Sequence, residues 1–309
     1  MSWVGWRLQR TETLITLAIL ALLAALLVPT GITMANAYHQ DGLGACLAIK
    51  PPGPVCEQRI GAFQLRFESL THLANWFTLI PGLVGVLLAA PFILDLEHRT
   101  YRLAWTQSIT RGRWLAGKLG VPIACALLAS GALILLLTWW RTPDAHLNGR
   151  LDTGIYDSEG TVVAGYMLFA FGLAVALGAV WRRSAASVTV AFIGYFAMRI
   201  FVDTWLRDRL VSPLKATYKG DKQPSFLNHA HVISDHASIG THQLAGGGGV
   251  LGGHAQLAAP GLDSSTVFHV VYQPASRFWS LQLAETGLFI GLAVVLVAFA
   301  VWWTRERIA

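Results

Sequence analysis

Long apolar runs separated by shorter polar segments are the dominant pattern along this chain. About 20 apolar residues are needed to cross ~30 Å of hydrocarbon as a helix, because each residue advances ~1.5 Å. We predict spans at residues 14–32, 72–94, 119–140, 162–180, 188–205 and 281–303. Strands with unpaired backbone amides are unstable in lipid, so these spans are predicted to be helices. The chain therefore reads as an all-α integral membrane protein with one transmembrane domain over residues 1–309.

Composition supports a bilayer as the solvent. Hydrophobic residues make up 54% of the chain and charged residues only 13%, which is more apolar than a soluble domain of this length requires. The first apolar run is long and has no convincing small-residue cleavage site, so we expect a retained span and not a signal peptide. Ahead of it, Trp3, Trp6, Arg7 and Arg10 predict a short interfacial helix over residues 1–13.

The distribution of lysine and arginine predicts the orientation. With the N-terminus inside, segments 1–13, 95–118, 181–187 and 304–309 hold eleven Lys and Arg residues, whereas the outside loops 33–71 and 141–161 hold five. Positive residues favour the cytoplasmic side, so both termini are predicted to face the cytoplasm of a cell membrane. The same bias explains the net charge of +6 without a nucleic-acid partner.

The long segment 206–280 is predicted to lie outside the cell. It contains a glycine-rich patch over residues 246–253 and has no strong periodicity. We expect irregular structure with a short helix or two, packed on the ends of the spans and not folded as an independent domain. Residues 181–187 are too few for anything but a tight hairpin between the fourth and fifth spans.

Two cysteines fall in the first outside loop. Cys46 and Cys56 are placed to form a disulfide in an oxidising exterior. The bond would be either a local staple of the loop or part of a lid over a transport path. Cys125 lies within the third predicted span, where we expect it to pack without a chemical role.

No arrangement of residues predicts catalysis or a bound cofactor in this chain. Outside histidines lack a tight ligand spacing, so we expect polar loop residues and no metal site; they are His229, His231, His236, His242, His254 and His269. Gly112–Leu119 approaches a phosphate-binding loop, but Leu119 replaces the hydroxyl residue that would hold magnesium. ATP and magnesium, if used, would sit on a partner subunit.

One pair of charges falls inside a predicted span. Arg199 and Asp203 are four residues apart, which places them on one helix face. Charges at membrane depth are costly and are often functional. We expect either a structural pair near the outer interface or a pair that lines a translocation path.

The polar segment between the second and third spans carries a resemblance to a known family. Residues Glu97–Trp114 read EHRTYRLAWTQSITRGRW, which is similar to the Glu-x-Gly-Thr-x-x-Leu-Ala-Trp-Thr-Gln-Ser stretch of type-2 ABC exporter permeases. Gln273–Trp279 and the Trp6-Arg7 entry support the likeness. The chain thus resembles a six-span ABC permease of the kind common in actinobacteria. Arg99 stands where that family usually has glycine, so Arg99 must adopt a glycine-like backbone conformation or the turn must differ.

The resemblance implies a function and a docking region. The loop 95–118 would be the coupling region that docks a separate ATP-binding subunit, and two permease halves, as a homodimer or a pair, would form the path of an ATP-driven exporter. The docking residues that the resemblance implies are Glu97, Thr100, Arg102, Trp105, Thr106, Gln107, Arg111 and Trp114. The alternative is a membrane sensor or scaffold with an outside ligand-binding segment. The apolar span faces do not identify a substrate, because helix packing in lipid requires the same residues.

Overall fold

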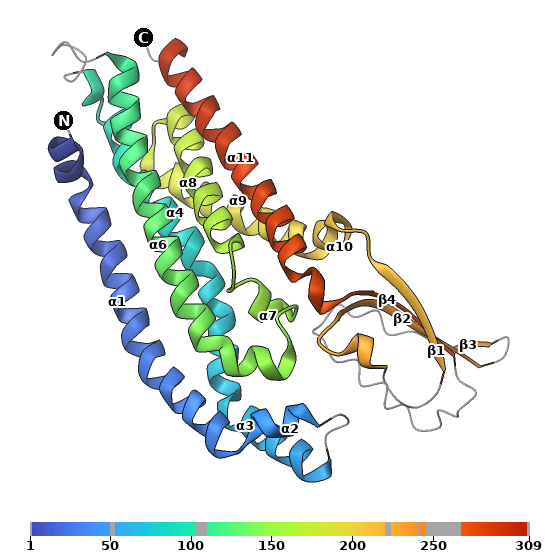
Figure 1. Ribbon diagram of the computed structural model, residues 1–309. Coiled ribbons are helices and arrows are strands. Elements are labelled where there is room, and N and C mark those ends of the chain that lie inside the picture. The colour runs from blue at the N-terminus through green and yellow to red at the C-terminus, as the bar shows by residue number, and fades with distance from the viewer. Residues whose placement is uncertain are drawn as a thin grey trace.

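Six helices form the body of the protein. The computed structural model describes residues 2–49, 53–102, 110–219, 224–239, 242–244 and 267–307, and six helices in these ranges are long and apolar enough to cross a membrane. They are α1 (Ser2–Gln40), α4 (Leu79–Glu97), α6 (Arg111–Asn148), α8 (Val162–Trp181), α9 (Ser184–Phe201) and α11 (Phe278–Arg307). Both chain termini lie at the same end of the bundle (Figure 1). We call this the terminal end and the opposite end the sheet end.

Helix α8 lies at the centre of the bundle. It packs against α4, α6, α9 and α11, and 78% of its most apolar window is buried, compared with 22% for α1. Its buried face includes Ala170, Gly172 and Ala174, and such small residues let neighbouring helices approach closely in a membrane. Because α8 is apolar on nearly every side and carries several small residues, it can pack against neighbouring helices on most of its faces.

The outer surface of the bundle is apolar. On α6, Leu128 and Leu135 are 76% and 75% exposed, and on α11 Val295 is 65% exposed. A soluble protein seldom leaves so many large side chains in water over one continuous surface. These exposed apolar side chains are in a favourable environment if the hydrocarbon of a membrane surrounds the bundle.

Several helices have other boundaries than the predicted spans; α6, for example, covers Arg111–Asn148 where the prediction was 119–140. Helix α1 runs unbroken from Ser2 to Gln40, so the predicted interfacial helix 1–13 is continuous with the first span. The tight hairpin after α8 is confirmed, because only Arg182 and Arg183 separate α8 from α9. Arg182 closes α8 in the left-handed conformation, with φ of 52°.

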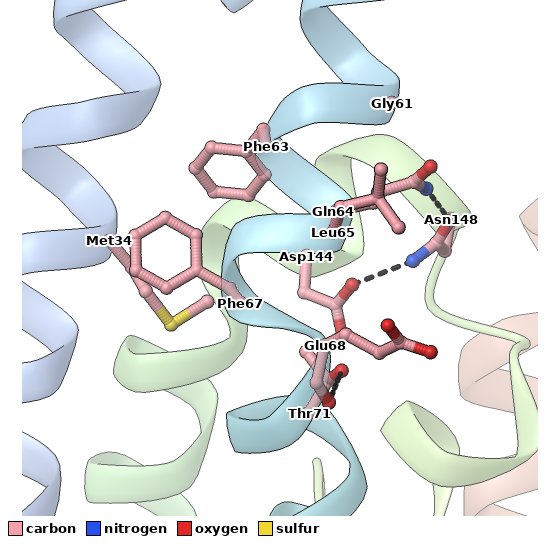
Figure 2. Close-up of a pocket in the computed structure, with 10 residues that line it drawn as sticks. All are labelled: Met34, Gly61, Phe63, Gln64, Leu65, Phe67, Glu68, Thr71, Asp144 and Asn148. Carbon is pink, nitrogen blue, oxygen red and sulfur yellow. Dashed lines mark hydrogen bonds between the residues drawn. The ribbon is translucent and has the colours of Figure 1, made fainter.

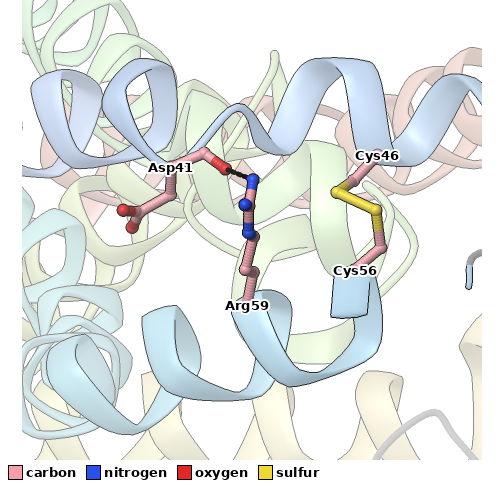
Figure 3. Close-up of a disulfide and its surroundings, with 4 residues drawn as sticks. All are labelled: Asp41, Cys46, Cys56 and Arg59. Carbon is pink, nitrogen blue, oxygen red and sulfur yellow. Dashed lines mark hydrogen bonds between the residues drawn. A yellow bond between two sulfur atoms is a disulfide. The ribbon is translucent and has the colours of Figure 1, made fainter. Parts of the chain in front are cut away.

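Helix α3 and several shorter elements cover the sheet end. These are α2 (Leu43–Ala48), α3 (Pro54–Asn75), the 3-10 turn η1 (Trp76–Thr78) that leads into α4, and α7 (Thr153–Tyr156) between α6 and α8. The predicted Cys46–Cys56 disulfide is present and joins α2 to the first turn of α3 (Figure 3). Arg59 donates to the Asp41 carbonyl at 3.2 Å, so a disulfide and a hydrogen bond both fasten this one loop.

A four-stranded antiparallel sheet occupies much of the segment before α11. After the π-helical turn η2 (Val202–Leu206) and α10 (Arg207–Leu210), the elements are β1 (Leu214–Lys219), the 3-10 turn η3 (Ser225–Leu227), β2 (His231–Ile239), β3 (His242–Leu244), β4 (Val267–Gln273) and the 3-10 turn η4 (Ala275–Arg277). The strand order is β1-β4-β2-β3. Our expectation of irregular structure over 206–280 was therefore wrong. Leu227, Phe268, Val270 and Tyr272 form a small core of the sheet's own.

The base of the sheet is tied to the helices. Gln273 at the end of β4 donates to the carbonyl of Val211 at 2.6 Å, and Arg277 donates to the carbonyl of Ser212. The sheet extends from this base away from the helix bundle (Figure 1). The chain thus leaves the helix bundle at α10 and returns to it at α11, and these two hydrogen bonds hold the two points together.

Candidate functional site

The start of the predicted coupling region is held by side chains of its own loop. Asp95 in the last turn of α4 forms an ion pair with Lys118 of α6, and the hydroxyl of Thr100 donates to the Asp95 carboxylate at 2.9 Å. The amide of Thr100 also donates to the Asp95 carbonyl at 3.1 Å. Asp95 therefore joins the two helices that flank the loop and fixes the turn between them.

Glu97 connects the same loop to a second hairpin. Its carboxylate accepts a hydrogen bond at 2.9 Å from the backbone amide of Ser184, the first residue of α9. The first amides of a helix have no partner within the helix, and its N-terminus attracts negative charge. Glu97 thus caps α9 from a different helix, so that the ends of α4 and α9 are joined at the terminal end.

The remaining predicted docking residues divide into exposed and buried ones. Thr100, Arg102 and Arg111 are exposed, and Arg111 donates to the Arg305 carbonyl at 3.0 Å, which ties α6 to the end of α11. Trp114 is only 8% exposed and lies against Phe92 and Tyr101, with ring centroids 6.1 and 6.5 Å away. Trp114 thus packs inside its own chain. Trp105, Thr106 and Gln107 lie outside the described residues.

Arg99 adopts the glycine-like conformation that its position in the motif requires. Its φ is 57°, in the left-handed region that costs a residue with a Cβ atom roughly 1–2 kcal/mol. We expect Arg99→Gly to leave the free energy of unfolding unchanged or to raise it by up to about 1 kcal/mol, because relief of this strain offsets the added freedom of glycine in the unfolded chain. Thermal unfolding of the purified protein measures the effect.

Arg102→Gly is the control for that variant, since Arg102 is exposed and helical. Glycine there is expected to destabilise the protein by up to about 1 kcal/mol. Equal destabilisation by the two variants would contradict a strained turn at Arg99.

A second group of functional side chains is a buried charge network at the sheet end. Arg207 of α10 donates to Glu285 of α11 at 3.0 Å and to Asp157 of the α7–α8 loop at 2.5 Å, and it pairs with Asp203 of η2. Arg199 of α9 donates to the other oxygen of Asp157 at 2.5 Å. We call Asp157, Tyr166, Arg199, Asp203, Arg207 and Glu285 the charge network.

Most of the network is removed from solvent, with Asp203 at its more exposed edge. Arg199 and Arg207 are each 8% exposed and Glu285 is 0% exposed. The hydroxyl of Tyr166 on α8 donates to Glu285 at 2.6 Å, and the Arg199 guanidinium lies over the Tyr166 ring, 4.2 Å from its centroid. Buried charges persist only when they are paired and hydrogen-bonded. Here residues from three regions of the chain, 157–166, 199–207 and the start of α11, satisfy one another.

The predicted Arg199–Asp203 pair needs correction. Among the described residues, Arg199 pairs with Asp157 and Asp203 pairs with Arg207. The α7–α8 loop brings Asp157 between the two arginines, where it pairs with both, whereas Asp203 pairs with Arg207. Burial raises the pKa of the Asp157 carboxyl, but Arg199 and Arg207 outweigh burial and hold that pKa below its usual range. Asp157 is therefore ionised at neutral pH.

The sequence analysis missed most of the charge network. Asp157, Tyr166 and Arg207 gave no local signal of a shared site, although Arg199, Asp203 and Arg207 are spaced at four-residue intervals, which is the spacing of one helix face. Glu285, near the start of the last span, is a central acceptor of the network, because both Tyr166 and Arg207 donate to it. The sequence did carry one signal of the network, namely the four-residue spacing of Arg199, Asp203 and Arg207 at the end of an otherwise apolar span.

The histidines of residues 206–280 that the structure describes are spread over the sheet and its base. Within the described ranges, no three His, Cys, Asp or Glu side chains are placed to hold an ion. His236 and His269 face each other across β2 and β4, and His231 lies 3.4 Å from Asp208. His254 lies outside the described residues.

Comparison with known proteins identifies the class of this bundle. The family described as ABC-2 membrane transporter related matches residues 17–207, which is more than half of the chain. Searches of curated proteins and of solved structures gave no match. The matched region begins in α1 and ends in α10, and it includes both arginines of the charge network and the predicted coupling region. This multi-pass membrane protein belongs to the ABC-2 membrane transporter related family.

Proposed function

We propose that this chain is the membrane-spanning subunit of an ATP-driven exporter in the cell membrane. The family implies partnership with an ATP-binding subunit, and the chain would form the translocation path together with a second copy or a paired permease. The loop 95–118 would dock the ATP-binding subunit on the cytoplasmic side. ATP hydrolysis would take place on that subunit and not on this chain.

The observation that carries the proposal is that the loop 95–118, which α4 enters and α6 leaves, is braced within itself and linked to two further helices, α9 and α11. Asp95 pairs with Lys118 across the loop, Glu97 caps α9, and Arg111 binds the end of α11. A force on this loop would therefore reach α4, α6, α9 and α11 together. A coupling region needs this property, because a partner must move several spans at once to shift the population between two states of the path.

The docking residues would have different roles. Arg102 and Arg111 lie within the loop and are exposed and charged, so they would contact acidic groups of the partner. Trp114 would act indirectly by holding the loop against Phe92 and Tyr101. Trp105 would be the aromatic anchor, the residue type that most often dominates the energy of an interface.

Co-purification with a candidate ATP-binding subunit produced together with this chain tests the proposal. We expect Glu97→Ala combined with Trp105→Ala to reduce both the recovered partner and the stimulation of its ATPase rate at least tenfold. Glu57→Ala combined with Trp76→Ala is the matched control, because both residues are exposed at the sheet end. Normal recovery and normal stimulation with the first double variant would exclude docking through this loop.

A further inference from the structure

A small cavity opens between α1, α3 and α6 at the sheet end, away from the charge network and the coupling region. Its volume is about 330 Å³, which lies at the lower end of the range for ligand sites. Helix α3 supplies one wall through residues spaced by three and four, namely Gly61, Gln64, Glu68 and Thr71. This spacing places them along one face of the helix.

The cavity has one apolar side and one polar side. Figure 2 shows Met34, Phe63 and Phe67 on one side and the carboxylates of Glu68 and Asp144 on the other. Phe63 and Phe67 are buried and lie close together, with ring centroids 4.8 Å apart. The apolar side is therefore a fixed surface suited to an aliphatic or aromatic group.

The polar side is acidic, with a buried carboxylate, Asp144, that is held in place and a more exposed one, Glu68. Asp144 is 7% exposed and accepts a hydrogen bond from the amide of Asn148 at 2.6 Å, while Asn148 accepts one from Gln64 at 3.0 Å. The basic side chains nearest the two carboxylates contact them only at long distances. Arg141 lies 3.5 Å from Asp144, and His72 lies 3.6 Å from Glu68. Both carboxylates retain acceptor capacity toward the cavity.

We propose that this cavity binds a small amphipathic organic cation. An ammonium group would sit at Glu68 and Asp144, and an aromatic or aliphatic group would lie against Met34 and Phe67. An anion is disfavoured by two carboxylates. A bare divalent ion is disfavoured because half of the wall is apolar and, within the described residues, no third acidic, histidine or cysteine ligand joins the pair. The site requires no ATP-binding subunit, so its test is independent of the proposed function.

Gly61 allows the cavity to be filled without removing a charge. A Cβ atom added there meets no described atom within 4 Å, and Gly61 lines the cavity. A leucine at this helical position extends into the open space and does not strain the backbone. Gly120→Leu is the matched control, since Gly120 is an exposed helical glycine of α6 with equally free surroundings.

The experiment titrates purified full-length protein with benzyltrimethylammonium by calorimetry, and with benzenesulfonate as the aromatic probe of opposite charge. We expect saturable binding of the cation at one site and at least tenfold weaker binding of the sulfonate. Gly61→Leu and Glu68→Gln should each weaken cation binding at least tenfold, whereas Gly120→Leu and Glu57→Gln should leave it unchanged. Asp144→Asn adds a third test if it folds. Equal binding of the two probes, or unchanged cation binding by Gly61→Leu, would overturn the proposal.

Discussion

Arg207→Ala is expected to lower the free energy of unfolding by about 3–5 kcal/mol, the cost of leaving buried charges without a partner. Arg207 donates to Glu285 and Asp157 and pairs with Asp203. Glu285 is fully buried, and its remaining donor would be Tyr166. Thermal or denaturant unfolding of the purified protein in detergent measures the loss.

Two further variants distinguish this role from a simple loss of charge. Arg209→Ala removes an exposed arginine two residues away and should change the free energy of unfolding by less than about 0.5 kcal/mol. Arg207→Lys should give an intermediate loss, because one ammonium group does not reproduce a guanidinium that donates through Nε and both Nη atoms. If Arg207→Ala and Arg209→Ala unfold alike, the charge network does not stabilise the sheet end.

Gly85→Ala is expected to destabilise the protein by about 3 kcal/mol, at the upper end of the cost of overpacking. A Cβ atom on Gly85 of α4 would lie 2.3 Å from the Met167 carbonyl oxygen and 3.1 Å from the Phe171 amide nitrogen of α8. Both neighbours are backbone atoms, so no side-chain rotation relieves the clash. The two helices would have to separate along the contact that holds the central helix in place.

A glycine in open surroundings provides the comparison for Gly85. Gly131 lies in α6, and a Cβ atom there meets no described atom within 4 Å. Gly131→Ala should stabilise the protein by up to about 1 kcal/mol through helix propensity. The unfolding temperatures of the two variants should therefore move in opposite directions, and a common shift would contradict the close approach of α4 and α8.

The membrane helices were predictable because a single physical requirement determines them. A run such as 162–180 is long and apolar at every position, and the observed helix α8 differs from it by one residue. The disulfide was predictable for a similar reason, since Cys46 and Cys56 share one short loop. The left-handed backbone at Arg99 followed from comparing this chain with a motif that has glycine at that position.

The sheet and the charge network depend on contacts between distant residues. β4 reads VFHVVYQ, which is rich in β-branched and aromatic residues, but it pairs with β1 some fifty residues earlier. The glycine-rich patch between them made the whole segment look irregular. Asp157 and Glu285 lie more than a hundred residues apart, and only the packing of α8 between α9 and α11 brings them to the same arginine. Local periodicity carries no information on such pairs.

The position of the loop 95–118 relative to the membrane is the central claim, and cysteine labelling in intact cells tests it most directly. Thr110 is exposed at the start of α6, and Lys215 is exposed on β1. In a background with Cys125→Ala, a membrane-impermeant maleimide should label Lys215→Cys in intact cells and Thr110→Cys only after the membrane is permeabilised. Labelling of Thr110→Cys in intact cells would place the loop outside, where no ATP-binding subunit meets it, and would contradict the account.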